Sequence, residues 1–476
     1  MLTYDKIKQL IPSVYSSDEM RTKQAEWMEW YTGTDKLHTY TVNDGIRVKT
    51  RKLPTLKMAS RTAEDWVSTI LSENWGIEVI SNKGQKITKA SSAFIQGTNG
   101  EKGVLGSTNF KTLLNDSLEY MFAIGTGAIA IALDDIGVTE DGSIVKTDDT
   151  KISFNSYIAQ EICPISFKNG IITEVAFATE QTSNGKKYDI LTEYRLDYDK
   201  TYIIRNRVFD NGQEIDTQEI GLIPYMRTGT TRPWFFIFTT SKANKIQFNS
   251  PLGESVYSDA LDVLYSIDLV YSCIKQEVIT GRRLVLFNKS LLTTDESGNP
   301  IVPDDALQSY FQFFSDEATS DIKEFVKEFH PNLNTDKLND ELQLQLNILS
   351  AKVGLGRKYY SLQDNSTITA TEYRGDAKEA SRNIKRQSTL IQHELQELIL
   401  SLLEIGADIL GINIDKDAKV TVTLRNATTD DIETERQRDL ELVKEKVMTV
   451  NEYRAKWMPE YEKLEDNSSA ENISTE

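Results

Sequence analysis

A chain of 476 residues is too long for one compact core, so its length predicts two or more packed regions. Hydrophobic residues at 39% and charged residues at 26% exclude a collagen-like, low-complexity or wholly disordered protein. The formal net charge of −18 argues against a protein that grips duplex DNA, because such proteins present an excess of Lys and Arg to the phosphates. Acidity that serves solubility is the simpler explanation of the charge, and a conduit to which phosphates do not adhere is the alternative.

Two further features bear on the cellular compartment. No run approaches the roughly 18 consecutive apolar residues of a membrane-spanning helix, and residues 1–11 lack the apolar core of a secretory signal. Cys163 and Cys273 are too few and too far apart for a disulfide scaffold or a Cys-based zinc site. We therefore expect a protein of the reducing cytoplasm that has no membrane attachment of its own, with both cysteines in the core.

Helices are predicted first along the chain. Residues 4–31, rich in aromatic side chains, read as one or two short helices that Gly33 ends and that form a packing arm. Apolar residues at helical spacing predict further helices at about 57–71 and 109–121, with a short strand over 77–80 between them.

Between Gly125 and Phe238 the pattern changes to short β-prone runs. The predicted strands are 128–133, 171–178, 190–196, 202–209 and 235–238. Turn signals such as Ser183-Asn184-Gly185 separate these strands and favour hairpins. The region is therefore predicted to be an antiparallel meander.

A long helix is predicted next. Ser250 suits its cap, Pro251 its first position and Glu254 its positive end, and the apolar face continues to about Thr280. We expect that face to contact other copies of the chain, although it could also be ordinary core. A short strand follows over 284–287, and the aromatic, acidic stretch up to about residue 330 could be helix or strand.

The rest of the chain is predicted to be mainly helical. A helix over 338–353 is broken by Gly354 and Gly356. The next helix runs from near Thr369 to Leu410, and its second half should be more deeply buried because charged residues crowd its first half. The chain finishes in a predicted strand over 419–424, predicted helices at about 430–447 and 450–457, and a polar tail that is predicted to be disordered.

No pattern in the sequence is typical of an enzyme. No stretch matches the phosphate-binding Walker A loop, and the three histidines are isolated from one another, without the spacing of a zinc site or a readable Ser-His-Asp set. Acidic pairs such as Asp134-Asp135 and Asp430-Asp431 suit loops and helix starts, although composition leaves a two-metal nuclease open. We predict a protein that is not an enzyme and needs no cofactor or metal.

Three stretches of the chain are specific enough to compare with known families. They are Ser250-Pro-Leu-Gly-Glu-Ser-Val-Tyr-Ser-Asp-Ala-Leu-Asp262 continuing to Arg283; residues 344–360 followed by Thr369-Ala-Thr-Glu372; and residues 430–457, with Val450-Asn-Glu-Tyr-Arg454. In this order they resemble three parts of the portal proteins of siphophages that infect Gram-positive bacteria: the first stem helix with the entry to the clip, the second stem helix with the tunnel loop and the start of the long wing helix, and the crown.

The resemblance implies an α+β portal fold that forms rings. The implied regions are an N-terminal arm and wing over 1–250, a first stem helix over 251–281, a clip over 282–335, a second stem helix over 336–353, a tunnel loop over 354–368, a long wing helix and strand over 369–426, and a crown with a disordered tail over 427–476.

The function implied by the resemblance is that of a head-to-tail connector in the virion. Typically twelve copies form a ring at one capsid vertex, and double-stranded DNA passes through it without sequence specificity during packaging and ejection. The implied partners are the terminase large subunit, which carries the ATP chemistry, the head-completion adaptor, and the major capsid and scaffolding proteins.

The resemblance also implies which residues lie nearest to DNA. The tunnel-loop candidates are Gly354, Gly356, Arg357, Lys358, Tyr359, Tyr360, Gln363 and Asn365. Glycines permit hinge-like backbone states, Arg and Lys can touch phosphates weakly, and the tyrosines could pack between subunits. An ordinary connector between helices is the alternative interpretation of this loop.

Arg282 and Arg283 are candidates at the junction of stem and clip, for assembly or DNA contact. Compensation of the helix dipole would also explain them. Two other functions stay open: a metal-dependent phage DNA-processing enzyme, and another oligomeric virion assembly protein.

Overall fold

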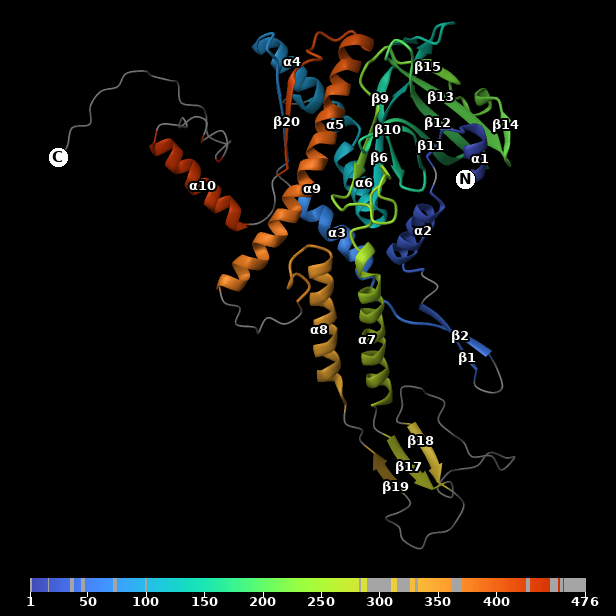
Figure 1. The fold of residues 1–476 in the computed structure, drawn as a ribbon, viewed down its shortest axis with the longest axis vertical. Coiled ribbons are helices and arrows are strands. Elements are labelled where there is room, and N and C mark those ends of the chain that lie inside the picture. Colours follow the sequence, from blue (N-terminus) through green and yellow to red (C-terminus); the bar gives the residue numbers. More distant parts are fainter. Residues whose placement is uncertain are drawn as a thin grey trace, which may run out of the picture. The chain divides into compact units, whose positions relative to one another are not determined.

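The computed structural model describes most of the chain. The described residues are 2–15, 17–34, 38–43, 48–71, 75–98, 101–281, 284–288, 310–314, 326–329, 333–361, 370–424 and 429–445, with Tyr453 and Trp457. They form an α+β protein, as predicted, in two compact units, Met1–Leu424 and Arg425–Glu476. The bounds of its elements follow in chain order, with the labels of Figure 1.

Two helices form the predicted N-terminal arm, α1 (Tyr4–Leu10) and α2 (Asp18–Thr32). The Ser17 hydroxyl caps α2 by accepting a hydrogen bond from the Met20 amide at 3.2 Å. Gly33 ends α2 in the left-handed conformation, at φ 72°. The arm is held on the β-rich region through Arg21, whose guanidinium donates to the Gln160 carbonyl at 2.6 Å.

The next helices enter the main hydrophobic core. α3 (Met58–Ile70) and α6 (Phe110–Ile124) lie where the sequence predicts helices, and they pack against each other through Trp66 and Phe122, whose rings stack 5.4 Å apart. Two helices between them are additional to the predicted elements, α4 (Gln85–Gln96) and α5 (Val104–Ser107).

The predicted meander is confirmed as a sheet in the strand order β10-β11-β12-β13-β14, with β15 pairing to β13. Its strands are β10 (Ile162–Lys168), β11 (Ile171–Ser183), β12 (Lys186–Leu196), β13 (Tyr202–Asp210), β14 (Gln213–Ile215) and β15 (Tyr225–Arg227). Asn184 and Gly185 both have positive φ, 52° and 77°, as the tightest hairpin turns require.

A second sheet packs against the meander, in the order β16-β6-β9. Its strands are β6 (Thr126–Asp134), β9 (Lys151–Ile158) and β16 (Phe235–Thr239). An aromatic layer joins the two sheets: Tyr157 stacks on Phe177 at 3.9 Å, and Tyr194 meets Phe235 edge-on at 5.5 Å. The predicted single meander is therefore wrong in one respect, because β6 and β16 belong to this separate sheet.

Several short elements complete the first half of the chain. They are the hairpins β1 (Thr39–Asn43) with β2 (Val48–Lys52), β4 (Gly97–Thr98) with β5 (Glu101–Lys102) and β7 (Gly137–Val138) with β8 (Ile144–Val145), strand β3 (Gly76–Ile80), and the 3-10 turn Thr217–Ile220.

The predicted start of the first long helix is wrong. α7 (Leu261–Thr280) begins after the 3-10 turn Ser258–Ala260, not at Pro251. The physical reason is that the preceding segment has other partners: the buried Glu254 carboxylate accepts hydrogen bonds from the Lys245 and Ile246 amides, and the Val256 amide donates to the Phe122 carbonyl at 3.0 Å. These bonds outweigh the local helix-start signal.

α7 pairs with α8 (Thr335–Lys352) in a helical hairpin, and Figure 1 shows the two helices side by side. Lys352 bonds to Asp262 at 3.1 Å, and the Asn334 amide donates to Glu277 at 3.0 Å, so the pair is joined near both ends. Cys273 lies exposed on α7, so its predicted core position is wrong, whereas Cys163 is buried as predicted.

The connection between α7 and α8 carries three strands. They are β17 (Leu284–Asn288), β18 (Tyr310–Phe314) and β19 (Val326–Phe329), in the order β18-β17-β19. β17 pairs parallel to β18 and antiparallel to β19. Within the described residues, the stretch that the sequence left open between helix and strand therefore contains strands.

The longest helix is α9 (Ala370–Glu404), followed by the π-helical turn Ile405–Ile409 and by β20 (Lys419–Thr423), which pairs with β3. The expected burial of its second half is confirmed. The fully buried apolar side chains there are Ile391, Leu395, Leu398, Ile399, Leu402 and Leu403.

In the unit Arg425–Glu476 the structure describes α10 (Thr429–Lys444), where a helix is predicted. Arg436 donates to the Tyr453 hydroxyl at 3.3 Å, and the Trp457 indole donates to Asp439 at 2.9 Å. The predicted helix over 450–457, apart from Tyr453 and Trp457, and the predicted tail lie outside the described residues.

Candidate functional site: the helical hairpin and its loop

The loop after α8 begins with a well-defined helix end. The Gly354 amide donates to the Ala351 carbonyl at 3.2 Å and the Leu355 amide to the Ser350 carbonyl at 3.1 Å, the two bonds of a Schellman motif. Gly354 is left-handed, at φ 82°, which a side chain would strain. The predicted break of the helix at Gly354 is confirmed.

Two neighbouring helices hold the start of this loop. From α3, the Trp66 indole donates to the Val353 carbonyl at 3.1 Å, and from α9, the Asn383 amide donates to the Gly354 carbonyl at 3.1 Å. Both donors lie far from the loop in sequence, so the sequence carried no signal for them. The first residues of the loop are therefore held by hydrogen bonds from α3 and α9.

The two tyrosines of the loop lie on α3. The Tyr360 hydroxyl donates to Thr62 Oγ1 at 3.3 Å, and the Tyr359 ring meets the Tyr360 ring edge-on at 5.1 Å. Nearby, Arg61 binds the buried Asp65 carboxylate through two contacts of 3.0 and 2.9 Å, and burial raises the pKa of Asp65. Tyr360 thus packs within its own chain, while Tyr359 keeps an exposed edge.

The remaining candidates divide into three groups. Gly356 is buried and has a positive φ of 95°, as a glycine permits. Arg357 and Lys358 are exposed, and no ion pair involves them within the part of the chain that the structure describes. Gln363, Asn365, Arg282 and Arg283 lie outside the described residues.

A small cavity beside Gly354, of about 210 Å³, was missed by the sequence reasoning. It is lined by three basic side chains, Lys242, Lys352 and Arg386. Lys242 pairs with Asp259 at 3.2 Å, and burial lowers the pKa of Lys242. Lys352 also pairs with a carboxylate, that of Asp262 at 3.1 Å, so two of the three basic side chains are in ion pairs.

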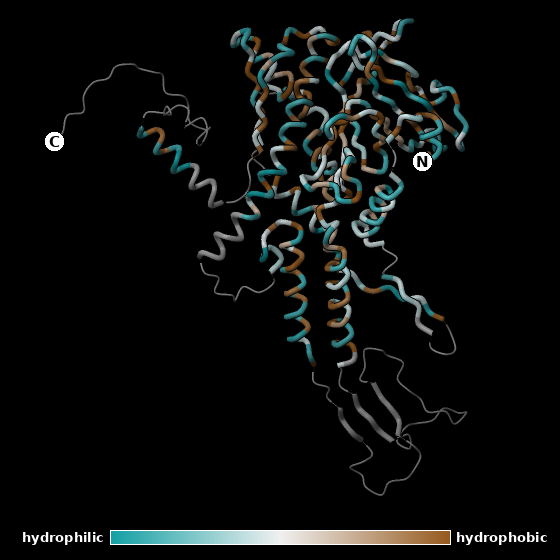
Figure 2. The backbone as a smooth tube through the Cα atoms, viewed as in Figure 1, coloured by the Kyte–Doolittle hydropathy of each residue, from teal (hydrophilic) through white to brown (hydrophobic). Residues whose placement is uncertain are grey.

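The helical hairpin presents apolar side chains to solvent. On α7, Tyr265 and Leu269 are 38% and 44% exposed, and on α8, Leu344 and Ile348 are 52% and 36% exposed. Residues four apart lie on one face of a helix, so each helix carries one exposed apolar stripe. Figure 2 shows hydrophobic residues recurring along both helices. Other apolar residues of the hairpin, such as Ile267 and Leu349, are fully buried.

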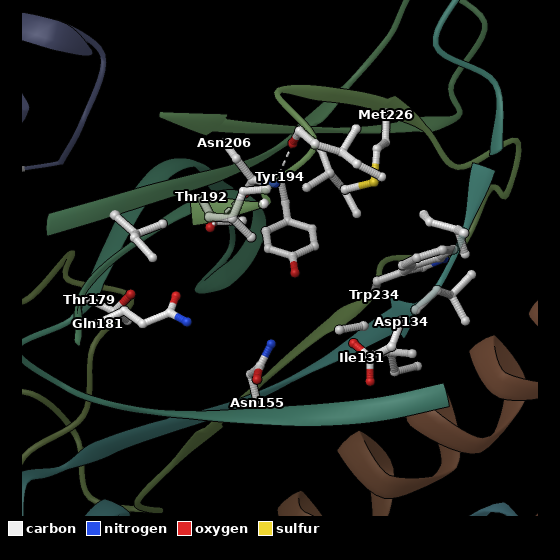
Figure 3. A pocket seen from close by; sticks show the side chains of 18 of the residues that line it. Ile131, Asp134, Asn155, Thr179, Gln181, Thr192, Tyr194, Asn206, Met226 and Trp234 are labelled. Carbon is white, nitrogen blue, oxygen red and sulfur yellow. Dashed lines mark hydrogen bonds between the residues drawn. The ribbon is translucent and has the colours of Figure 1, made fainter. Parts of the chain in front are cut away.

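A wider cleft lies between the two sheets of the first unit. It has a volume of about 730 Å³ and is lined from β6, β9, β11, β12 and β13 (Figure 3). The sequence reasoning missed it, because its walls come from strands that only the tertiary structure brings together.

Over the described residues, no group of three or more His, Cys, Asp or Glu side chains is arranged to hold a metal ion. None of the described helices combines the length and apolarity needed to cross a bilayer.

Among the comparisons with known proteins, the matches come from solved structures. No family model matches the sequence, and no curated protein does so either. Among solved structures, the fold is similar to the neck of a native GTA particle computed with C12 symmetry, at 8% identity and a TM-score of 0.39, over 83% of this chain and 88% of that one. Inferences about function therefore rest on the geometry of this chain itself.

Proposed function

We propose that this chain is the portal protein of a tailed phage, of the type found in siphophages of Gram-positive hosts. Copies of it form a ring, typically of twelve, at one vertex of the capsid. Double-stranded DNA is packaged through the ring by the terminase and later ejected through it. The protein belongs to the virion, is not an enzyme and acts without a cofactor.

The observation that carries the proposal is the pair of exposed apolar stripes on the helical hairpin. Fully burying an exposed Leu or Ile side chain stabilises a protein by about 1.5–3 kcal/mol, so a contact that covers the exposed parts of Leu269, Leu344 and Ile348 would stabilise an assembly. Because the stripes lie on different helices, the α7 stripe of one copy can pack on the α8 stripe of the next. Such a head-to-tail contact repeats and closes into a ring.

The charge distribution supports passage of DNA rather than tight binding. With a net charge of −18, the chain as a whole repels phosphates. Arg357 and Lys358, exposed next to the end of α8, offer a few weak contacts with the DNA backbone. Such contacts are independent of base sequence, as a conduit requires.

The division of labour within the chain is part of the proposal. The hairpin is the stem, the strand-bearing connection over 282–335 is the clip that meets the terminase and then the head-completion adaptor, and residues 427–476 form the crown. The sheets and α9 form the wing, which meets the major capsid and scaffolding proteins.

Electron cryo-microscopy of virions tests the proposal directly. We expect a ring at a single vertex, with an axial channel of about 20 Å or more, enough for B-form DNA. Absence of a ring at every vertex would refute the portal assignment. A ring without a channel of this width would instead indicate a different virion assembly protein.

Substitutions in the stripes test the interface itself. Leu269→Glu and Leu344→Glu should each prevent ring closure, which native mass spectrometry of the assembled protein would report. Ile171→Glu, at an exposed apolar residue of β11, is the matched control and should leave assembly unchanged. Normal rings from both stripe variants would contradict the proposed contact.

A metal-dependent DNA-processing enzyme is the second candidate, and among the described residues no group of three or more His, Cys, Asp or Glu side chains is arranged to hold its metal. It predicts cleavage of plasmid DNA on addition of Mg²⁺ or Mn²⁺, an assay that separates the two functions.

A further inference from the structure

The cleft between the two sheets has the size and the rigid lining of a binding site. Its volume of about 730 Å³ falls within the range of ligand pockets. One wall is the meander and the other is formed by β6 and β9, so both are rigid strands. Figure 3 shows Asn155, Gln181 and the Tyr194 hydroxyl pointing toward the same space from different strands.

Apart from two carboxylates at one end, the hydrogen-bonding side chains of the cleft are uncharged. They come from Asn155, Thr179, Gln181, Thr192 and Asn206. The charged residues that line the cleft are Asp134 and Asp135, both acidic, and neither Lys nor Arg is among the lining residues. A nucleotide or a DNA phosphate would meet no cation there, so the cleft disfavours anionic ligands.

The aromatic residues of the cleft are covered. Trp234 is 1% exposed and Tyr194 3% exposed, and the Trp234 indole already donates to Thr230 at 2.9 Å. A sugar ring is usually held against an open aromatic face, which these residues do not offer. Thr192 donates to Asn206, and Asn206 donates to the Ile223 carbonyl, each at 2.8 Å. The polar side chains left for a ligand are therefore mainly those of Asn155, Thr179 and Gln181, and such groups pair well with the amide groups of a polypeptide.

One backbone edge at the cleft lacks a partner. β16 pairs with β6 only as far as Ala130, and the Ile131 amide still donates to the Trp234 carbonyl at 2.7 Å. If the pairing continued, Leu133 would face Arg232 of the segment that leads into β16. Pro233 interrupts the pairing, and the Arg232 amide donates to the Glu404 carboxylate at 3.1 Å instead of to β6. On that side, Leu133 has no backbone partner among the described residues, although it lines the cleft.

We propose that this cleft binds an extended polypeptide segment of a partner protein, uncharged where it crosses the cleft and carrying a basic side chain at the end near Asp134 and Asp135. The segment pairs with the free edge of β6 at Leu133, and the amide side chains of Asn155 and Gln181 bind its main chain. Strand addition supplies affinity, and the acidic pair sets the charge preference. This site is separate from the proposed stem, so the test of peptide binding does not depend on whether the protein is a portal.

The test uses the full-length protein and three synthetic probes in isothermal titration calorimetry. The first is the blocked peptide acetyl-Thr-Val-Thr-Val-Lys-amide, the second is the same peptide with Glu in place of Lys, and the third is maltotetraose. We expect the Lys peptide to bind about 2- to 5-fold more tightly than the Glu peptide, the range that one partly exposed ion pair supplies. Asp134→Asn combined with Asp135→Asn should remove that preference.

Variants locate the binding. Gln181→Trp places a bulky ring in the cleft and should abolish binding of the Lys peptide, whereas Thr182→Trp, at an exposed neighbour on the same strand that does not line the cleft, should leave it unchanged. Equal binding to both Trp variants, or no binding of either peptide to the wild-type protein, would overturn the proposal. Binding of maltotetraose alone would replace the polypeptide with a saccharide and overturn it as well.

Discussion

His38 Nε2 lies 2.8 Å from Asp268 Oδ2, and both side chains are buried. The pair joins the start of β1 to the middle of α7, across 230 residues of sequence. The other carboxylate oxygen of Asp268 accepts a hydrogen bond from the Leu56 amide at 2.7 Å, and the Trp30 ring lies edge-on to the imidazole at 5.1 Å. A buried carboxylate therefore fixes α7 to the N-terminal part of the chain.

Replacing His38 should destabilise the protein strongly. His38→Ala removes the imidazole that is hydrogen-bonded to the buried Asp268 carboxylate, and the loss of that partner costs about 1–3 kcal/mol. Urea unfolding of His38→Ala and of the double variant His38→Ala/Asp268→Asn measures the loss in the free energy of unfolding. The double variant should recover part of this loss because it has no buried carboxylate. A loss below about 0.5 kcal/mol in the single variant would contradict this role for the pair.

Glu394 should make stability depend on pH. Burial in α9, together with the neighbouring Glu397 carboxylate, raises the pKa of Glu394 to about 7. An acid whose pKa is raised in the folded state stabilises the fold below its unfolded pKa, near 4.5, and that stability is lost as the pH rises through 7. The loss amounts to about 3 kcal/mol at most.

Unfolding free energies at pH 5, 6, 7 and 8 test this expectation. Glu394→Gln keeps the shape of the side chain without a titrating group, so its stability should change less over this range than that of the wild type. Glu397→Gln removes the neighbouring charge, so the pKa of Glu394 is raised less and the loss of stability should shift to lower pH. Parallel pH profiles for the wild type and Glu394→Gln would exclude Glu394 as the source.

Gly354→Ala should destabilise the end of α8. The left-handed backbone, at φ 82°, costs a non-glycine residue about 1–2 kcal/mol. In addition, a Cβ would lie 3.0 Å from Asn383 Nδ2, the donor that holds the Gly354 carbonyl. Gly221→Ala, at φ 74° with open space around the Cβ position, is the control that carries backbone strain alone. Thermal unfolding should show the larger loss for Gly354→Ala, and equal losses would mean that Asn383 moves aside freely.

Trp66→Phe should loosen the loop after α8 while leaving most of the core packed. The substitution removes the donor to the Val353 carbonyl but keeps a ring beside Phe122, and leaving that buried carbonyl unpaired costs about 1–3 kcal/mol. Hydrogen exchange over residues 353–361 should accelerate more than exchange over α6. Unchanged protection of the loop would show that Asn383 alone holds it.

Local chemistry explains why part of the fold was predictable. The Asn-Gly turns of the meander and the glycine ends of α2 and α8 depend on residues within a few positions of each other, so they can be recognised from sequence. The same holds for the buried second half of α9, whose apolar spacing persists over many turns.

The candidate site was predictable only in part, for the same reason. The sequence indicates where α8 ends, but the donors that hold the loop, Trp66 and Asn383, come from distant helices. Likewise, β9 and β10 lie in stretches without a strong strand pattern, and they become strands by pairing with β6 and β11.

The start of α7 shows most clearly how tertiary contacts decide between local alternatives. Ser250, Pro251 and Glu254 together form a good local signal for a helix start, yet the Glu254 carboxylate binds the Lys245 and Ile246 amides. By itself, therefore, the sequence determined the α+β class, the hairpin turns and the ends of several helices, because these depend on short-range sterics and hydrogen bonding. Only the tertiary structure decided where α7 begins, which apolar stripes stay exposed and where the cleft opens, because these depend on contacts between residues far apart in the chain.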